Sequence, residues 1–361
     1  MTAKTKVVVA MSGGVDSSLT AALLLQQGYD VIGVTMNLSE ESRDYDENSD
    51  RGCCSLSAVD DAKSVADKLG IPHYVMNFKE MFQEKVVDYF IKEYGEARTP
   101  NPCIACNRYI KFEGLLDRAL KLGAEYVATG HYAKIIKDSE TGRYLLKKGA
   151  DANKDQSYVL YHLNQNTLKH FMFPLGDLNK TETRKMAAEL GLSVANKPES
   201  QEICFVPNDD YKTFLEEKAP AMLTPGNIIN TAGEILGKHK GLALYTIGQR
   251  KGLGIAAKQP LYVLKLDQTN NSVVVGFEDE IFSQELIATD LNFLLFDKLT
   301  VAMEVKAKVR YAAKEASAFI VPLDGDKVRV IFKDKQRAIT PGQAVVFYQD
   351  DIVIGGGTII D

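Results

Sequence analysis

Four short apolar runs, dense in Val and Ile, recur along the first 200 residues, with segments of helical spacing between them. Runs of this length and composition predict parallel strands that are buried on both faces. A glycine follows each helical segment, where glycine commonly ends a helix. The predicted strands are residues 7–11, 31–36, 74–78 and 126–130; the predicted helices are residues 17–27, 57–69 and 112–122, followed by Gly28, Gly70 and Gly123. The alternation predicts an α/β fold, a doubly wound parallel sheet, over residues 1–207, with ligands at the carboxyl ends of its strands.

The pattern changes after residue 207. A short helical stretch at residues 209–218 leads into Gly-rich segments of strand length. These segments predict a small, mostly-β central domain over residues 208–281. They are GNIINTAGEILG, GLALYTIGQRKGLGI, LYVLKLD and NSVVVGFE.

From residue 282 onward the chain alternates apolar and polar positions as antiparallel strands do. VKAKVRY (305–311) shows it best, and KVRVIFK (327–333), PGQAVVFY and IVIGGGTII follow. The predicted apolar face carries Val305, Ala307, Val309 and Tyr311, and the opposite face carries Lys306, Lys308 and Arg310. Residues 282–361 are therefore expected to form a small C-terminal β-barrel.

Composition narrows the class of protein. At 361 residues, 45% of them hydrophobic, the chain is long enough for more than one core. No apolar run reaches the ~20 residues that span a bilayer, and the N-terminus MTAKTK resembles neither a signal peptide nor a presequence. A cytoplasmic protein is expected.

The net charge of −5 gives no sign of nucleic acid, but residues 301–343 carry nine basic against five acidic residues, so the barrel is the candidate surface for RNA.

The segment VVVAMSGGVDSS joins a predicted strand to a predicted helix through Ser12, Gly13 and Gly14. Adjacent glycines allow a close approach of the backbone to an anion, and the helix N-terminus favours negative charge. The segment lacks the lysine of a G-x-x-x-x-G-K-[ST] loop. It resembles the pyrophosphate-binding loop of the N-type ATP pyrophosphatases, which cleave ATP to AMP and pyrophosphate. On that resemblance Asp16 would help to hold Mg²⁺ on the pyrophosphate.

Five cysteines are too few for a disulfide framework in a chain of this length, so catalysis or metal binding is the better interpretation. Cys103 and Cys106 form a C-x-x-C, predicted on a loop before a helix that begins near Asn107, where the thiolate form is favoured. Structural zinc, a redox dithiol and a nucleophile all compete for such a pair. Zinc would need four ligands, and no second pair supplies them. Cys53 and Cys54 are interpreted as incidental.

Several further motifs extend the resemblance over nearly the whole chain. With the SGGVDS loop they resemble, in order, the bacterial tRNA-specific 2-thiouridylase family within the N-type ATP pyrophosphatases. Members of that family make 2-thiouridine at the wobble position of the tRNAs for Lys, Glu and Gln. The motifs are TPNPCIACNRYIKF (99–112), ATGHYA (128–133), KDQSYVL (154–160), ESQEICF (199–205) and YTIGQRKGLGI (245–255).

The resemblance implies a role for each matching residue. Cys106 would be the nucleophile and Cys204 the carrier of the persulfide. ATP would be bound by Ala10, Met11, Ser12, Gly13, Gly14, Val15, Asp16, Ser17, Met36 and Gly130. The target base would meet Asn101, Pro102 and Cys103, and the rest of the tRNA would meet His131, Lys154, Asp155, Gln156, Arg310, Tyr311 and Gln343.

One residue departs from the family pattern. Typical members have Asp where this chain has Cys103, so the group that handles the N3 proton of the uracil is in question. Cys103, Cys106 and Cys204 also make a set of three thiols, the number that holds a 4Fe-4S cluster with one open iron. Such a cluster would present sulfide to the base in place of a persulfide, and the sequence leaves both routes open.

The resemblance implies a reaction sequence. ATP binds at the SGGVDS loop, the flipped uridine attacks the α-phosphate through O2, and sulfur from Cys204 replaces that oxygen. Cys106 and Cys204 finish as a disulfide that an external thiol reduces. The implied sulfur donor is a cysteine desulfurase or a sulfur-relay protein.

Two other functions remain open at this point. One is a different ATP-pyrophosphatase ligase, similar to argininosuccinate or GMP synthetase, which needs no pair of cysteines. The other is an iron-sulfur RNA-binding protein with a regulatory nucleotide loop.

Overall fold

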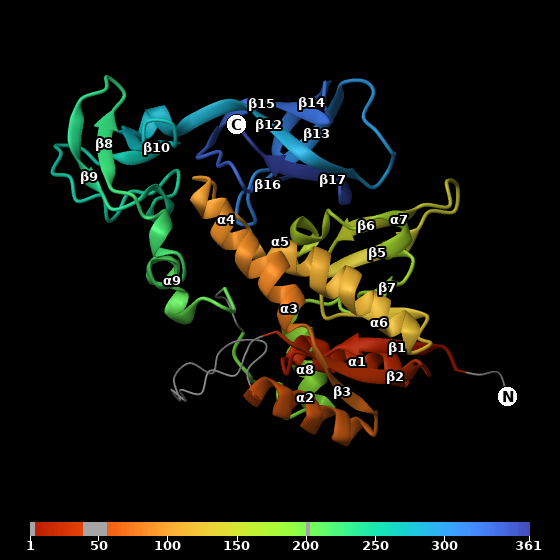
Figure 1. Ribbon diagram of the computed structural model, residues 1–361. Coiled ribbons are helices and arrows are strands. Elements are labelled where there is room, and N and C mark those ends of the chain that lie inside the picture. The colour runs from red at the N-terminus through yellow and green to blue at the C-terminus, as the bar shows by residue number, and fades with distance from the viewer. Residues whose placement is uncertain (1–3, 39–55, 200–202) are drawn as a thin grey trace. The chain divides into compact units, whose positions relative to one another are not determined.

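The computed structural model describes residues 4–38, 56–199 and 203–361 (Figure 1). Cys53 and Cys54 lie outside the described residues. The chain forms two compact units: residues 1–87, 103–209 and 351–353 make the first, and residues 88–102, 210–350 and 354–361 make the second. Within the described ranges, no helix has the length and apolar character needed to cross a membrane.

A five-stranded sheet forms the centre of the first unit, with the order β3-β2-β1-β4-β7 and every pair parallel. The direction of the strand order reverses between β1 and β4, and ligands of doubly wound sheets bind at such a reversal, beyond the carboxyl ends of the strands. The strands are β1 (Lys6–Ala10), β2 (Asp30–Asn37), β3 (His73–Asn77), β4 (Tyr126–Ala128) and β7 (Phe171–Met172).

The central strands are buried on both faces, as predicted. Val7 and Val9 pack into one core with residues of α1 (Val15–Gln26) and α2 (Leu56–Leu69), and Val8, on the opposite face of β1, is also fully buried. The glycines that were expected to end the helices do so in the left-handed conformation: φ is +90° at Gly28, +67° at Gly70 and +74° at Gly123.

The expectation of two buried faces is wrong for β3. This strand is the edge of the sheet, and Tyr74 and Val75 are 53% and 50% exposed. A strand at the edge of the sheet has no strand on its outer side to help cover it, although its composition is the same as that of a central strand.

The helix that carries the C-x-x-C begins earlier than predicted. It runs without interruption through α5 (Pro102–Ala105), a π-helical segment (Cys106–Gly114) and α6 (Leu115–Lys121). A proline suits the first turn of a helix, where its missing N–H would have no partner in any case. The prediction of a loop up to Asn107 is therefore wrong, and both thiols lie in the first turns of a helix.

The other elements of the first unit are α3 (Lys79–Phe82), β5 (Ala133–Lys137), β6 (Tyr144–Lys148), α7 (Gln165–Leu168) and α8 (Lys180–Glu189).

The second unit contains α4 (Tyr89–Gly95), α9 (Tyr211–Lys218) and a small sheet with the order β10-β11-β8-β9. Ile228, Val263 and Val273 belong to its core. The sequence GLALYTIGQRKGLGI was expected to include a strand, but its regular structure is a single 3-10 turn (Leu242–Leu244). The strands of the small sheet are β8 (Gly226–Asn230), β9 (Ile235–His239), β10 (Tyr262–Asp267) and β11 (Ser272–Gly276).

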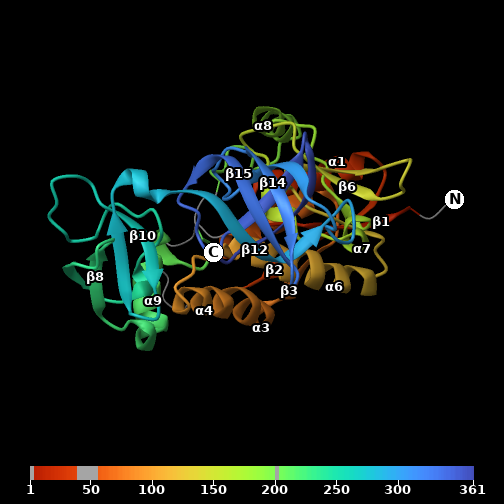
Figure 2. The same ribbon diagram turned by 90° about the horizontal axis from the view of Figure 1, so that it is seen from above.

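Six strands close into the predicted C-terminal barrel, because β12 pairs with both β15 and β17 in the order β12-β15-β14-β13-β16-β17. Figure 2 shows β12, β14 and β15 side by side. The core includes Val305, Ala307 and Val309, as the alternation predicted. The strands are β12 (Phe282–Phe293), β13 (Met303–Lys308), β14 (Ala316–Leu323), β15 (Lys327–Arg337), β16 (Ala344–Gln349) and β17 (Ile352–Ile359).

Tyr311 does not share the buried face of β13. The strand ends at Lys308, the chain bends at Arg310, and the Tyr311 side chain is 43% exposed in the turn that follows. The two-residue period holds through Val309, one residue past the end of the strand, and fails at the bend that follows.

Candidate active site

The turn between β1 and α1 touches other backbone segments so closely that glycine is required. Gly13 has φ of +67°, and a Cβ built there would lie 2.2 Å from the carbonyl oxygen of Ala58. Gly130 follows β4, and a Cβ on it would lie 2.8 Å from the carbonyl carbon of Asp16 and 2.9 Å from the amide nitrogen of Ser17. The structure therefore brings Gly130 against the predicted phosphate loop.

Hydrogen bonds within this turn fix its shape. The Ser12 amide donates to Ser17 Oγ at 3.1 Å, and Ser17 Oγ lies 3.3 Å from the Gly14 carbonyl oxygen, to which it donates. Gly14 is the N-cap residue of α1 and provides no side-chain cap, so the helix begins at Val15 with amide groups suited to an anion. The turn at the carboxyl end of β1 therefore has a backbone shape compatible with the predicted phosphate site.

Met36 lies at the same edge of the sheet. The Met11 amide donates to the Val34 carbonyl at 2.8 Å, and Met36 follows two residues later, at the end of β2. The residues predicted to bind ATP thus come from the ends of three adjacent strands, β2, β1 and β4.

Lys180 is the main partner of the Asp16 carboxylate. Its Nζ donates to Oδ1 at 2.8 Å and to Oδ2 at 2.7 Å, and the Lys180 side chain is only 12% exposed. The Tyr132 hydroxyl also donates to Asp16 Oδ1, at 2.8 Å, and burial raises the pKa of Tyr132 so that it stays protonated. A buried cation therefore lies beside the phosphate loop, although the loop itself contains no lysine.

Glu199, in the ESQEICF motif, joins this cation to a second one. Its carboxylate accepts from Lys180 Nζ at 2.8 Å and from Lys154 Nζ at 2.6 Å. Although partial burial opposes ionisation, these hydrogen bonds and charges lower the pKa of Glu199 to about 2. A chain of opposite charges thus runs from Asp16 through Lys180 and Glu199 to Lys154.

The three predicted functional cysteines are thiols, not disulfides. Cys103 and Cys204 are exposed, whereas Cys106 is only 9% exposed. Cys106 begins the π-helical segment, and helices widened in this way are frequent at functional sites.

Packing relates the Cys204 segment to the helix that carries Cys106. The Phe205 ring meets the Phe82 ring edge to face, with centroids 5.8 Å apart. The same α3 region packs on the cysteine helix at Gly114, where a Cβ would lie 2.9 Å from the Met81 sulfur and 3.0 Å from the Phe78 ring. Phe205 and Gly114 thus contact the same short stretch of chain around α3.

Three of the residues predicted to contact tRNA have side chains engaged within the first unit. His131 is buried with Nδ1 2.6 Å from Thr129 Oγ1, and burial holds its pKa well below the ordinary value. Asp155 accepts from the Ser157 hydroxyl at 2.8 Å, and Gln156 Oε1 accepts from the Tyr132 amide at 3.0 Å. In this structure these side chains shape the segment, and Lys154 is the one whose charge extends to the ionic chain.

Gln343 lies beside the TPNP segment in the second unit. Its Nε2 donates to the carbonyl oxygens of Thr99 at 2.8 Å and Pro100 at 3.3 Å, directly before Asn101. The Tyr311 ring lies 5.4 Å from Lys308 Nζ, close to Arg310. Two predicted tRNA-contact groups in this unit are thus positioned by local contacts.

Sequence reasoning missed Lys180, Tyr132 and Glu199, and it did not predict that Lys154 pairs with Glu199. One local signal exists: Asn179 and Glu182 form a capping box that marks the start of α8. The box predicts a helix beginning at Lys180, but no local pattern indicates its pairing with Asp16, 164 residues away.

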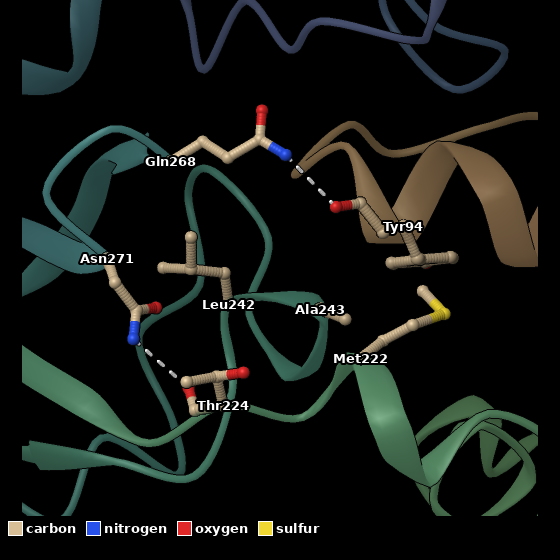
Figure 3. Close-up of a pocket in the computed structure, with 8 residues that line it drawn as sticks. Tyr94, Met222, Thr224, Leu242, Ala243, Gln268 and Asn271 are labelled. Atoms are coloured by element: carbon tan, nitrogen blue, oxygen red, sulfur yellow. Dashed lines mark hydrogen bonds between the residues drawn. The ribbon is translucent and has the colours of Figure 1, made fainter.

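The second unit contains a cavity of about 270 Å³ (Figure 3). Gln268 Nε2 donates to the Gly95 carbonyl at 3.2 Å and Asn271 Nδ2 to the Thr224 carbonyl at 3.3 Å, so both amides hold its walls together. None of the predicted site residues is among its lining, which is Tyr94, Gly95, Met222, Thr224, Leu242, Ala243, Gln268 and Asn271.

Three family models match the chain in order. They are described as tRNA methyl transferase HUP domain (residues 5–208), tRNA methyl transferase PRC-barrel domain (212–277) and Aminomethyltransferase beta-barrel domain (283–359). The tRNA-specific 2-thiouridylase MnmA of Acetivibrio thermocellus is 57% identical over 356 residues, 99% of both chains. The tRNA-specific 2-thiouridylase MnmA 1 of Thermoanaerobacter pseudethanolicus is 59% identical over 354 residues, 98% of this chain and 97% of that one.

This chain belongs to the tRNA-specific 2-thiouridylase family. The family expected from the sequence motifs is thereby confirmed, and so is the fold of an α/β sheet domain followed by a small central domain and a β-barrel. A solved 4-thiouridine synthetase–RNA complex with bound ATP aligns with 60% of this chain and 51% of that chain at 17% identity and a TM-score of 0.35, too weak a likeness for an argument. For this 2-thiouridylase family member, the groups just described are the candidate active site.

Proposed function

We propose that this chain is an ATP-dependent tRNA sulfurtransferase that adenylates O2 of the wobble uridine and replaces it with sulfur, giving 2-thiouridine, AMP and pyrophosphate. The observation that carries the proposal is the Asp16–Lys180 pair beside the SGGVDS turn, in the same compact unit as Cys106 and Cys204. The near full-length identity to proteins named tRNA-specific 2-thiouridylase supports it.

The ATP phosphates would lie against the turn and the start of α1. Gly13 and Gly130 each pack closely against neighbouring backbone and have no side chain of their own. They therefore leave backbone, not side chains, at this surface. Lys180 supplies the positive charge that the loop lacks, so the leaving pyrophosphate gains a cation within reach of Asp16.

Magnesium would neutralise the ATP phosphates and is expected to use Asp16. One protein carboxylate combined with phosphate and water oxygens is a usual arrangement for Mg²⁺ in nucleotide sites. Because both Asp16 oxygens accept from Lys180, the residues fit Mg²⁺ only if Lys180 turns to a phosphate at the same time.

The thiols supply the sulfur chemistry. The exposed Cys204 is accessible to a sulfur donor, and the buried Cys106 is shielded from solvent and unwanted oxidants. The S–S bond of the Cys204 persulfide breaks as Cys106 bonds to Cys204 Sγ, so that these two cysteines are left joined as a disulfide. The outer sulfur of the persulfide becomes bonded to C2 of the uridine, and the C2–O bond breaks as AMP leaves with the original oxygen.

A 4Fe-4S cluster is not supported by the arrangement of these residues. In the part of the chain that the structure describes, no three His, Cys, Asp or Glu side chains are grouped so as to hold a metal ion. No step of the proposed reaction is therefore assigned to a cluster.

The tRNA contacts proposed for Arg310, Tyr311 and Gln343 have the support of the local positive charge of residues 301–343. Those proposed for Asn101, Pro102 and Cys103 rest on the family motif at residues 99–112. Gln343 holds the backbone just before Asn101 and therefore acts on the base pocket through that segment. We include in the proposal the tRNAs for Lys, Glu and Gln as substrates and a cysteine desulfurase or relay protein as the sulfur donor. The proposed location is the cytoplasm. The proposed domains are residues 1–207, 208–281 and 282–361.

Mass spectrometry of nucleosides tests the proposal. Unmodified tRNA is incubated with the enzyme, ATP, Mg²⁺, cysteine desulfurase and cysteine, and is then digested to nucleosides. We expect a uridine in which sulfur has replaced oxygen. Its mass differs from that of a methylated uridine, which a tRNA methyltransferase would produce. Cys106→Ala and Cys204→Ser should give no 2-thiouridine, whereas Cys53→Ser and Cys54→Ser should remain active. Product formed without ATP, or in full yield by Cys204→Ser, would refute the proposed reaction.

A further inference from the structure

Cys103 and Cys106 lie one helical turn apart, and their exposure differs. Cys103 is exposed near the start of the helix, and Cys106, three residues later, is buried. Side chains at positions i and i+3 of a helix are neighbours, with Cβ atoms ~5–6 Å apart. A disulfide needs a Cβ separation of ~3.5–4.5 Å, so a small adjustment of the first turn brings the two sulfur atoms into bonding range.

Burial of Cys106 creates a difficulty for the proposed reaction. Each turnover leaves Cys106 joined to Cys204, and the enzyme must be reduced before it can act again. Thiol–disulfide exchange depends on access to the sulfur that is attacked, and the Cys106 residue is only 9% exposed. An external reductant can therefore open this bond only at Cys204, the same exposed sulfur that the donor must reach. A neighbouring thiol on the same helix has no such barrier.

We infer that Cys103 is the resolving thiol of this enzyme. The inference rests on the proposed sulfur transfer and concerns the step after it. Cys103 loses its proton, and its thiolate attacks Cys106 Sγ; the Cys103–Cys106 bond forms, the Cys106–Cys204 bond breaks, and Cys204 leaves as a thiolate that takes up a proton. This step moves no net electrons.

A second exchange completes the cycle. An external dithiol attacks the exposed Cys103 sulfur, both enzyme thiols are regenerated, and the dithiol becomes a disulfide. Cys204 is then a free thiol at the end of the first step, ready for the sulfur donor before the reduction is finished. A cysteine at position 103 can thus form a disulfide with Cys106, which an aspartate at this position could not do.

Disulfide mapping tests this role. The full-length protein, purified without oxygen, is oxidised with diamide, alkylated at intervals, digested without reductant and analysed by mass spectrometry. We expect Cys106–Cys204 to appear early and to give way to Cys103–Cys106, with Cys204 becoming available to the alkylating reagent. In Cys103→Ser, Cys106–Cys204 should persist.

Repeated turnover gives a second readout. An internal thiol acts at an effective concentration of roughly a millimolar, so with an external dithiol at a tenth of that, release of the Cys204 thiol between turnovers should be about tenfold slower in Cys103→Ser than in the parent. Cys53→Ser is the matched control, and circular dichroism checks that each variant folds.

Two results would overturn the inference: a parent enzyme that retains only Cys106–Cys204 while Cys103 is alkylated, or bound iron and sulfide that protect Cys103 from the reagent. The diamide arm needs neither tRNA nor ATP. If the first turnover yields no 2-thiouridine, the proposed function fails, and the exchange among the three thiols is still decided separately.

Discussion

Lys180 donates hydrogen bonds to both carboxylate oxygens of Asp16, at 2.8 and 2.7 Å, although 164 residues separate the two in the chain. The pair places a cation beside the turn predicted to bind phosphate, which has none of its own. Because Glu199 accepts from the same ammonium group, the charge of Lys180 is balanced before any nucleotide binds.

Replacing Lys180 by Met should weaken the binding of ATP and pyrophosphate but leave AMP nearly unaffected. A charge-assisted hydrogen bond contributes about 2 kcal/mol, which corresponds to roughly a thirtyfold change in dissociation constant. Titration calorimetry with the three ligands measures the difference. Lys185→Met is the control, because Lys185 lies on the same helix with its side chain 75% exposed. An equal loss of AMP affinity would mean that Lys180 only maintains the fold.

Replacing Gly130 by Ala should impair nucleotide binding and lower the free energy of unfolding by about 1–3 kcal/mol. The added methyl group would meet the backbone of Asp16 and Ser17 at 2.8–2.9 Å, and backbone at a helix start cannot move aside cheaply. Gly237→Ala is the matched control, since its nearest neighbour would be 3.6 Å away. Urea denaturation measures the free energy of unfolding, and ATP titration measures nucleotide binding. Unchanged values for Gly130→Ala would show that the residue after β4 does not pack closely against the SGGVDS turn.

Glu199→Gln should destabilise the protein at neutral pH, and the difference from the parent should vanish in acid. The pKa of Glu199 is lowered from 4.5 to about 2 in the folded state, so its ionised form contributes stability above pH 4.5 that is lost as the pH falls through about 2. Urea denaturation of both proteins from pH 7 down to about pH 2 follows the convergence. Glu189→Gln, at an exposed pair with Lys185, should show little effect at any pH. A difference independent of pH would assign the effect to packing.

Removing the Arg310 side chain should weaken tRNA binding and flatten its salt dependence. One lost phosphate contact changes the slope of log affinity against log salt by roughly 0.7 to 0.9. Filter binding of tRNA at several salt concentrations measures the slope, and nucleotide binding in the first unit should be unchanged. A slope equal to that of the parent would place the RNA backbone elsewhere than at the bend after β13.

The sequence by itself determined the features that local patterns encode. Val7 and Val9 predicted a buried strand, Gly28 a helix end, and the alternation around Val305 a barrel strand, because burial and backbone conformation repeat with a period that short segments display. The SGGVDS turn was predictable for the same reason, since strand, glycines and helix are adjacent in the chain. The motifs around Cys106 and Cys204 carried the family resemblance.

Only the tertiary structure decided which distant groups meet and which elements lack a neighbour. The pairing of Asp16 with Lys180 and the burial of His131 depend on contacts between segments that share no local pattern. Exposure of Tyr74 follows from the position of β3 at the sheet edge, which its composition does not reveal. The early helix start at Pro102 buries Cys106 while leaving Cys103 exposed, and that difference comes from packing, which spacing along the chain cannot specify.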